Sequence, residues 1–279
     1  MAETSIKLVA FIDILGFSQL ISDYDSGKDR DIFTVLKSAL DPAADFIKKG
    51  FMQGNNDLFF EWRSCLEAKL FSDCLCVAAP LEYLTYGFGE QLSFFYKYLM
   101  AYQNLLMEHG FFTRGAVTIG SHYSDENLIF SGGLVEAYNL ETKICKYPRI
   151  MASDALMGEI FKLGRKYKSS LGYMLELGND GIFFFNHFNY NIIDSKVSDM
   201  FSKDFLSLLG FEGLMESFYD IDIKKKNEEL NKKKAIAESK LFGLEPNGSV
   251  AEKYKWFISF IDYQLGGENP LGFRDFSKI

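Results

Sequence analysis

The sequence predicts an α+β fold in which helices cover a mostly antiparallel sheet. Between residues 7 and 185, short apolar or alternating segments typical of strands are interspersed with segments of helical periodicity. From about Ile193 onward the pattern is helical only. Hydrophobic residues make up 48% and aromatic residues 16% of the 279 residues, which is enough for a large core. We therefore expect a sandwich domain over residues 1–192 and a helical C-terminal extension over residues 193–279.

The first predicted strand is the most apolar one. Leu8–Ile12 is an uninterrupted apolar run of the kind that a sheet buries on both faces, so we assign a strand to Lys7–Asp13. A glycine-containing turn follows, and a helix is expected over Phe17–Tyr24. Asp31–Lys49 carries apolar residues at helical spacing and is predicted as a second helix.

A hairpin and a long helix are expected next. Two strands, Glu61–Lys69 and Cys74–Ala79, are joined by a tight turn around Ser72 and Asp73. Leu81–His109 is rich in aromatic residues and is predicted as one long helix that ends at a glycine. The elements that follow are, in order, a strand at Thr113–Gly120, a glycine turn at Ile129–Gly133, a helix at Leu134–Glu141, a strand at Arg149–Ala152, a short helix from Asp154 and a strand at Asp180–Phe185.

The C-terminal extension is predicted to hold three helices. Leu206–Phe218 is amphipathic, and Lys253–Leu265 places aromatic and branched residues at helical spacing. Lys224–Lys240 is dominated by lysine and glutamate. A lysine-rich segment can bind nucleic acid, but the interleaved glutamates favour a solvated helix face. The net charge of −8 also disfavours a protein that tracks a phosphate backbone, so we expect no direct nucleic-acid partner.

The N-terminus lacks the pattern of a secretory signal, in which a basic region precedes an apolar stretch. No apolar run approaches the roughly 18 residues that indicate a membrane span. These features predict a soluble, cytoplasmic protein that does not contact a membrane.

Two acidic residues stand where apolar packing gives no reason for a charge. Asp13 ends the first strand in the sequence Phe-Ile-Asp-Ile-Leu-Gly-Phe-Ser, and Asp73 follows in Phe-Ser-Asp-Cys. A carboxylate beside the backbone N–H groups of a helix start can hold Mg²⁺ against a phosphate. Two such carboxylates suit two metal ions on a nucleoside triphosphate. The alternative is that Asp13 caps a helix and Asp73 only belongs to a tight turn.

Four sequence motifs, in order along the chain, resemble those of class III nucleotidyl cyclases. Phe11–Ser18 is similar to their first metal-binding motif, F-x-D-I-x-G-F-[ST], and Arg114–Gly120 to their R-x-G-[IV]-x-x-G strand. Lys69–Asp73 resembles their second motif, with a base-contacting position four residues before the second metal-binding aspartate. Residues 131–143 and 146–150, which read SGGLVEAYNLETK and KYPRI, look like those of the pyrimidine cyclases of bacterial antiphage (Pycsar) systems.

The resemblance implies a class III cyclase-like sandwich and two-metal catalysis. Asp13 and Asp73, with the Ile14 carbonyl, would bind two Mg²⁺ or Mn²⁺ ions in each active site. The residues that would bind the phosphates through backbone N–H groups are Gly16, Phe17 and Ser18.

Arg114 would supply a fixed positive charge near the triphosphate, the alternative being an arginine on the strand surface. Lys69 would contact the base. An ammonium only donates hydrogen bonds, so it suits a carbonyl such as uracil O4 or cytosine O2; the alternative is that Lys69 pairs with a carboxylate on the sheet. In the resembling cyclases two subunits pair head-to-tail, which implies a homodimer with composite active sites.

One departure from the family concerns the helix at Leu134–Glu141. Ordinary adenylyl cyclases carry Asn and Arg where this chain has Val135 and Asn139, and that arginine stabilises the leaving pyrophosphate. We expect Asn139 as the catalytic replacement or Arg149 as a phosphate-binding residue.

The resemblance implies a second-messenger synthase of antiphage defence. It would convert UTP to 3′,5′-cyclic UMP and pyrophosphate, and the product would act on a separate effector protein. The alternatives are a cytidylate cyclase, a purine cyclase, and a degenerate domain that binds a nucleotide or partner without turnover.

Overall fold

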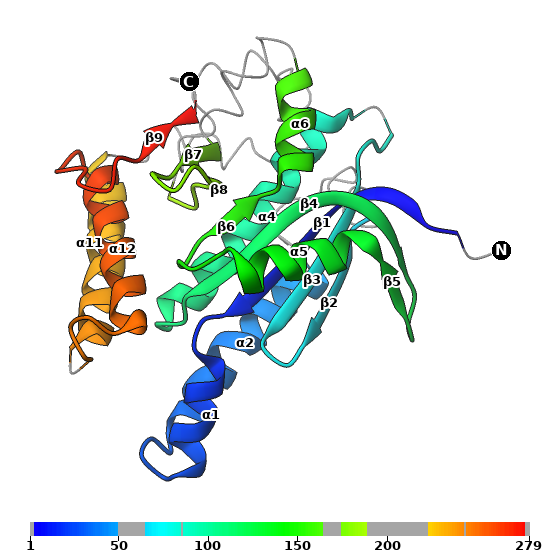
Figure 1. Ribbon diagram of the computed structural model, residues 1–279. Coiled ribbons are helices and arrows are strands. Elements are labelled where there is room, and N and C mark those ends of the chain that lie inside the picture. Colours follow the sequence, from blue (N-terminus) through cyan, green and yellow to red (C-terminus); the bar gives the residue numbers. More distant parts are fainter. Residues whose placement is uncertain are drawn as a thin grey trace.

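The computed structural model describes residues 3–49, 65–84, 86–163, 174–188, 223–242 and 244–276. Within these ranges helices cover a nine-stranded sheet, ordered β2-β3-β1-β4-β6-β8-β7-β9, with β5 paired to β4 (Figure 1). All described strand pairs are antiparallel except β4 with β6. The predicted α+β class with a mostly antiparallel sheet is therefore confirmed.

The strands are β1 (Ser5–Ile14), β2 (Glu67–Phe71), β3 (Cys74–Pro80), β4 (Thr113–Ser124), β5 (Ile129–Ser131), β6 (Ile150–Ala152), β7 (Leu175–Leu177), β8 (Phe183–Phe185) and β9 (Arg274–Asp275). The helices are α1 (Phe17–Asp25), α2 (Ile32–Lys49), α4 (Phe88–Glu108), α5 (Gly132–Lys143), α6 (Asp154–Lys162), α11 (Ile223–Leu241) and α12 (Ser249–Gln264).

The side chains of β1 point alternately to the two faces of the sheet. Ile12 and Ile14 point into the larger core, which α2, α4 and α6 cover from one side. Phe11 points to the other side, where it packs with Ala137 of α5. Figure 1 shows α5 in front of the sheet and α4 behind it. The next residue on the α5 side of β1 is Asp13, because side chains alternate along a strand.

A pair of glycines sets the distance between α5 and the sheet. A Cβ atom added at Gly120 of β4 would lie 2.6 Å from the Cα of Gly133, at the start of α5. A Cβ added at Gly133 would lie 2.8 Å from the side chain of Val9. Both contacts are shorter than atoms tolerate, so only glycine lets the helix approach β1 and β4 this closely.

Some element boundaries differ from the sequence prediction. Helix α4 begins at Phe88 and not at Leu81, because Tyr83 and Tyr86 pair through their backbones and Gly87 is extended. Ile129–Ser131, predicted as part of a glycine turn, pairs with β4 as strand β5. Strands β7 and β9 were not predicted, since two or three residues carry no readable alternation.

The C-terminal helices share a hydrophobic cluster with the sheet. Phe112 and Phe184, from the strand region, pack with Trp256, Phe257 and Phe260 of α12. Strand β9 extends the sheet by pairing with β7. The predicted helix at Leu206–Phe218 and the boundary between residues 192 and 193 lie outside the described residues, so that boundary stays a prediction.

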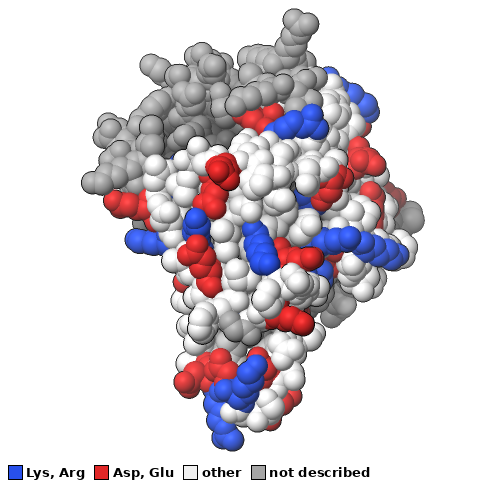
Figure 2. Space-filling model, turned by 60° about the vertical axis from the view of Figure 1, so that its left-hand side comes forward, with Lys and Arg blue, Asp and Glu red and all other residues white. Residues whose placement is uncertain are grey.

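The surface that carries α11 and α12 has mixed charge. On the face in Figure 2, Lys and Arg side chains are interspersed with Asp and Glu, without a continuous basic area. None of the helices in the described ranges is long and apolar enough to cross a membrane.

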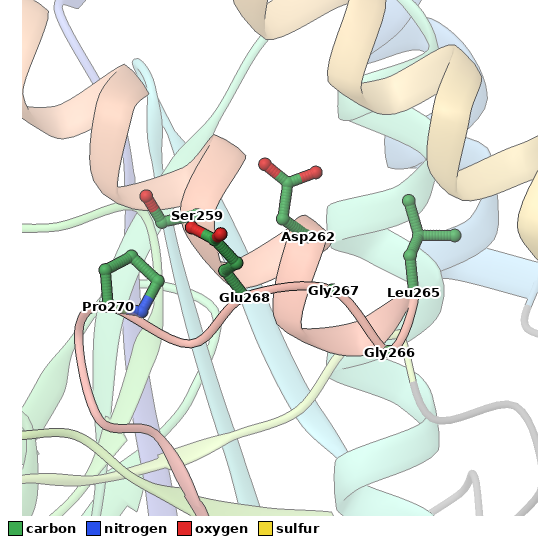
Figure 3. A pocket seen from close by; sticks show the side chains of 7 residues that line it. All are labelled: Ser259, Asp262, Leu265, Gly266, Gly267, Glu268 and Pro270. Atoms are coloured by element: carbon green, nitrogen blue, oxygen red, sulfur yellow. The ribbon is translucent and has the colours of Figure 1, made fainter.

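A hollow of about 490 Å³ lies at the C-terminal end of α12 (Figure 3). Its lining includes the carboxylates of Asp262 and Glu268 and three other polar or apolar side chains, but no His, Cys, Lys or Arg. The Asp262 carboxylate already accepts a hydrogen bond of 2.7 Å from Lys234 of α11. One of the two carboxylates that line this hollow is therefore already paired, and we assign no catalytic role to the hollow.

The glycine contact generates a prediction about stability. We expect Gly120→Ala to lower the free energy of unfolding by about 1–3 kcal/mol, because the new methyl group meets backbone atoms that cannot rotate away. Urea unfolding would measure the change. Gly158→Ala in α6 is the matched control: its Cβ would meet nothing within 4 Å, so the variant should be as stable as wild type or more stable. Equal stability of Gly120→Ala and wild type would contradict the packing argument.

Candidate functional site

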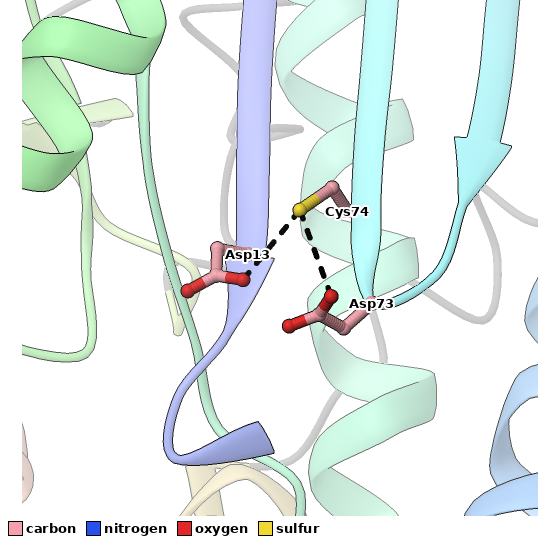
Figure 4. A group of neighbouring side chains, drawn as sticks. All are labelled: Asp13, Asp73 and Cys74. Atoms are coloured by element: carbon pink, nitrogen blue, oxygen red, sulfur yellow. Dashed lines mark hydrogen bonds between the residues drawn. The ribbon is translucent and has the colours of Figure 1, made fainter. Parts of the chain in front are cut away.

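Strand register brings together the acidic residues that the sequence singles out. Asp13 is paired with Cys74 of β3 on one side and with Arg114 of β4 on the other. Asp73 precedes Cys74 in the β2–β3 turn, where Ser72 adopts a left-handed conformation with φ 56°. One ligand atom from each of Asp13, Asp73 and Cys74 lies within 4.8 Å of the other two (Figure 4). We call these three residues the carboxylate cluster.

Within the carboxylate cluster, the Cys74 thiol contacts both carboxylates. The Cys74 Sγ lies 3.7 Å from Asp13 Oδ1 and 3.8 Å from Asp73 Oδ1. Burial raises the pKa of the Cys74 thiol, and the negative charges of Asp73 and Asp13 raise it further. The thiol therefore stays protonated and donates weakly to the carboxylates.

Asp13 is held in an environment that disfavours its charge. Burial raises its pKa to about 7, and a hydrogen bond with Asp73 together with the charges of Asp73 and Glu141 adds to the effect; Arg114 opposes it. Two carboxylates that share a site repel each other unless a proton or a cation lies between them. The charge of Arg114 offsets the repulsion between Asp13 and Asp73 only in part, and an added cation would offset more of it, which fits a metal-binding function.

Arg114 lies between two carboxylates. Its Nη2 is 3.5 Å from Asp13 Oδ2, and its Nε is 2.5 Å from Glu141 Oε1. The Arg114 side chain is 23% exposed and the Glu141 side chain 2%. The guanidinium is therefore held in place beside the carboxylate cluster, and the role of Arg114 toward a triphosphate stays a prediction.

Glu141 was not predicted as a site residue. It lies on the buried side of α5, four residues after Ala137 and eight after Gly133. The spacing of four residues places Gly133, Ala137 and Glu141 on one side of the helix, and this spacing is visible in the sequence. A glutamate on a buried side needs a charged or polar partner, so the spacing could have indicated a site residue. The close approach of α5 to the sheet brings this carboxylate to Arg114.

The first N–H groups of α1 have no side-chain partner at the start of the helix. Gly16 is the N-cap residue, with φ 82°, so Asp13 does not cap this helix and that alternative is wrong. The helix has neither a side-chain cap nor an acidic residue in its first turn. The first N–H groups of a helix have no partner within it, so those of Phe17 and Ser18 are directed to whatever lies before the helix. The predicted phosphate-binding role of Gly16, Phe17 and Ser18 stays a prediction that this geometry favours.

Three further predicted residues do not belong to the carboxylate cluster. Ile14 ends β1 directly after Asp13, and the metal-binding role of its carbonyl stays a prediction. The Lys69 ammonium, on β2, donates to the backbone carbonyl of Asp125 in the β4–β5 turn. Asn139 is half-buried on α5, but it lies two residues before Glu141 and hence on another side of the helix.

Arg149 contradicts its predicted role in phosphate binding. Its side chain is 0% exposed, and its guanidinium pairs with both carboxylate oxygens of Asp180, at 3.2 and 2.5 Å. The rings of Tyr147, Phe184 and Trp256 lie 5.3–5.4 Å from the guanidinium carbon. The arginine of the KYPRI sequence is thus a structural residue that links β6 to α12, and it has no surface to offer a substrate.

No protein-family model matches the chain, and no curated protein matches it. Among solved structures, it is similar to the catalytic core of a rhodopsin-guanylyl cyclase with converted specificity, in complex with ATPαS. The identity is 13%, the TM-score is 0.41, and the match covers 66% of this chain and 97% of the other. A likeness at this level establishes neither the family nor the activity of this chain.

The raised pKa of Asp13 generates a prediction about stability and pH. The folded protein holds the Asp13 proton more tightly than the unfolded chain does, so this group loses its stabilising contribution as the pH rises from about 4 through about 7. Asp13→Asn carries no charge to desolvate. Without metal, we expect it to raise Tm relative to wild type by several degrees at pH 8, and by much less at pH 5.

Thermal unfolding in EDTA at the two pH values would measure this effect. The control is Asp23→Asn, because Asp23 is hydrogen-bonded to Gln19 and its lowered pKa leaves it ionised at both pH values. Added Mn²⁺ should raise the Tm of wild type and not that of Asp13→Asn. The same Tm difference between Asp13→Asn and wild type at both pH values would show that Asp13 is not electrostatically strained.

Proposed function

We propose that this protein is a nucleotidyl cyclase that converts UTP to 3′,5′-cyclic UMP and pyrophosphate. The observation that carries the proposal is the pairing of Asp13 and Asp73 at the end of β1, next to the uncapped start of α1 and to Arg114. The sequence resemblance to pyrimidine cyclases supports the choice of substrate. By the same resemblance, we propose that cyclic UMP acts in the cytoplasm on a separate effector protein in antiphage defence.

The donor set of the carboxylate cluster fits Mg²⁺ or Mn²⁺. These ions prefer oxygen ligands, which Asp13 and Asp73 supply. Softer metals would need a cysteine thiolate, whereas the Cys74 thiol stays protonated. When bound, two such ions would lower the pKa of the attacking 3′-hydroxyl and stabilise negative charge on the phosphate oxygens. Asp13 would lose its shared proton when a cation enters.

The chain's own groups would position the triphosphate. The N–H groups at the start of α1 favour an anion, and the positive end of the helix dipole adds to them. Arg114 is held by Glu141 at Nε, and its Nη2 lies on the side of Asp13. A guanidinium fixed in this way can bind a phosphate oxygen without first losing rotational freedom.

A second copy of the chain would supply the base contacts. Lys69 lies outside the carboxylate cluster of its own chain, which fits a role in the site of a partner. Large apolar side chains are exposed on α5 and on the β2–β3 and β4–β5 hairpins, and an exposed group of this kind favours protein association. They are Phe71, Leu128, Phe130, Val135 and Tyr138. Asn139, on the same helix as Val135, would then face the partner's site.

A second candidate function is nucleotide binding without turnover. The observation that favours it is the burial of Arg149, which removes one of the two groups predicted to replace the family's arginine. Val135 and Asn139 offer no positive charge in its place.

The substrate experiment separates these possibilities. Purified protein is incubated with each of the four ribonucleoside triphosphates and Mn²⁺, and the products are separated by chromatography. We expect cyclic UMP as the main product, because an ammonium at Lys69 pairs with uracil O4 but opposes the cytosine amino group, and such mismatches discriminate by ~10⁴ or more. Cyclic CMP as the main product would overturn the role of Lys69. Cyclic AMP or cyclic GMP would overturn the pyrimidine specificity, and nucleotide binding without any product would overturn the cyclase activity.

Asp73→Asn should lower turnover by at least about 10³-fold while leaving Tm within a few degrees of wild type.

The composite-site proposal predicts complementation. Asp13→Ala and Lys69→Ala are each inactive as homodimers, but a heterodimer has one site in which both residues are intact. Mixing the two variants should restore activity, up to half of the wild-type sites. Two affinity tags would isolate the heterodimer, and a mixture of Asp13→Ala with Asp73→Ala is the control, because both substitutions fall in the same half of a site and rescue should fail. An inactive heterodimer of Asp13→Ala with Lys69→Ala would place each site within one chain.

A further inference from the structure

The first half of α12 packs against the chain segments that flank the carboxylate cluster. The rings of Tyr254 and Phe257 lie 5.3 and 4.9 Å from the ring of Phe112, in edge-to-face geometry. Phe112 comes two residues before Arg114, and its carbonyl accepts a 2.8 Å hydrogen bond from the N–H of Leu15, two residues after Asp13. A helix from the C-terminal extension is therefore anchored at the base of the candidate site.

Lys253 is the charged residue that this anchoring brings to the site. It precedes Tyr254 and lies one helical turn before Phe257, so it shares the side of α12 that faces Phe112. The side chain is half-buried. Burial and the charge of Arg114 lower the pKa of the Lys253 ammonium, whereas the charges of Glu141 and Asp13 oppose this shift. A long, flexible stem lets a lysine bury its methylene groups and still extend its ammonium to a polar neighbour.

The two cations of the site differ in what they already bind. Arg114 forms ion pairs with both Asp13 and Glu141. In the described part of the chain, Lys253 forms no ion pair of 4.0 Å or less. A half-buried ammonium without a bound carboxylate is unfavourable on its own and becomes favourable when an anion arrives. Lys253 thus has donor capacity to spare at a site where negative charge is expected to bind.

We propose that Lys253, supplied by the C-terminal helices, binds the polyphosphate chain of the nucleotide and takes the place of the arginine that α5 lacks. This inference rests on the proposed function, because it assigns a residue to the same site. A compact ammonium binds phosphate as a point charge and does not need the planar geometry of a guanidinium. The helical extension is then part of the active site.

The competing role for Lys253 is structural: it would only neutralise the buried Glu141. The two roles are separated by three substitutions on α12. Lys253→Met keeps the length of the apolar stem and loses the charge, whereas Lys253→Arg keeps the charge. Lys255→Met is the matched control two residues away, since Lys255 is exposed and donates to the carbonyl of Pro246.

Binding of inorganic tripolyphosphate to the full chain, measured by calorimetry with and without Mn²⁺, tests the assignment independently of base and turnover. We expect Lys253→Met to raise Kd by about tenfold or more, Lys253→Arg to stay within about threefold of wild type, and Lys255→Met to bind as wild type does. None of the three variants should have a lower Tm than wild type. In turnover assays, Lys253→Met should then lose kcat/KM by a similar factor.

Several outcomes would overturn the assignment. One is equal tripolyphosphate binding by Lys253→Met and wild type, and another is no measurable binding by wild type. A third is recovery of tight binding in the double variant Lys253→Met/Glu141→Gln, which would show that Lys253 acts only through Glu141. If no triphosphate is cyclised but Lys253→Met still weakens tripolyphosphate binding, the cyclase proposal fails and the assignment of Lys253 stands. If wild type makes a cyclic nucleotide and Lys253→Met binds tripolyphosphate normally, the cyclase proposal stands and the assignment of Lys253 fails.

Discussion

The register of β1 between β3 and β4 is the constraint on which the candidate site depends. It pairs Asp13 with Cys74 on one side and with Arg114 on the other. Because side chains alternate along a strand, a slip of one residue would turn Asp13 into the core beneath α2 and α4. The apolar residues on both faces of β1, which are almost fully buried, make such a slip very unfavourable. The hydrophobic pattern of one strand therefore fixes the position of a charged group that the same pattern would otherwise exclude.

The close packing of α5 on the sheet also determines which charged groups meet beside β1. Gly120 and Gly133 let α5 lie close to the sheet, which brings Glu141 to the guanidinium of Arg114. Arg114 neutralises part of the charge of Asp13, but Asp73 and burial still hold the Asp13 pKa near 7. Two carboxylates that oppose each other's charge therefore lie together at the end of β1. A cation between them would relieve this repulsion, and the proposed metal site rests on that relation.

The sequence predicted much of this arrangement. The class of fold and the order of the main elements followed from hydrophobic periodicity, and Asp13 and Asp73 stood out as charges in apolar surroundings. Arg149 was assigned wrongly, because a sequence does not show that Asp180 and Trp256 enclose the guanidinium. Glu141 was missed although its spacing from Gly133 and Ala137 places it on the same side of α5, because only the packed structure shows that this side meets Arg114. The position of Lys253 likewise follows from how α12 packs on the sheet. Local patterns specify elements, but contacts between distant elements depend on the assembled core.

The cage around Arg149 has a consequence for the order in which the protein matures. Its rings come from Tyr147, Phe184 and Trp256, so it is closed only when α12 has docked. During synthesis the N-terminal strands leave the ribosome long before α12 does, and domains fold as they emerge. A nascent chain therefore carries Asp13 and Asp73 before it carries the ring of Trp256. The order of synthesis thus delays the enclosure of Arg149 until α12 has left the ribosome.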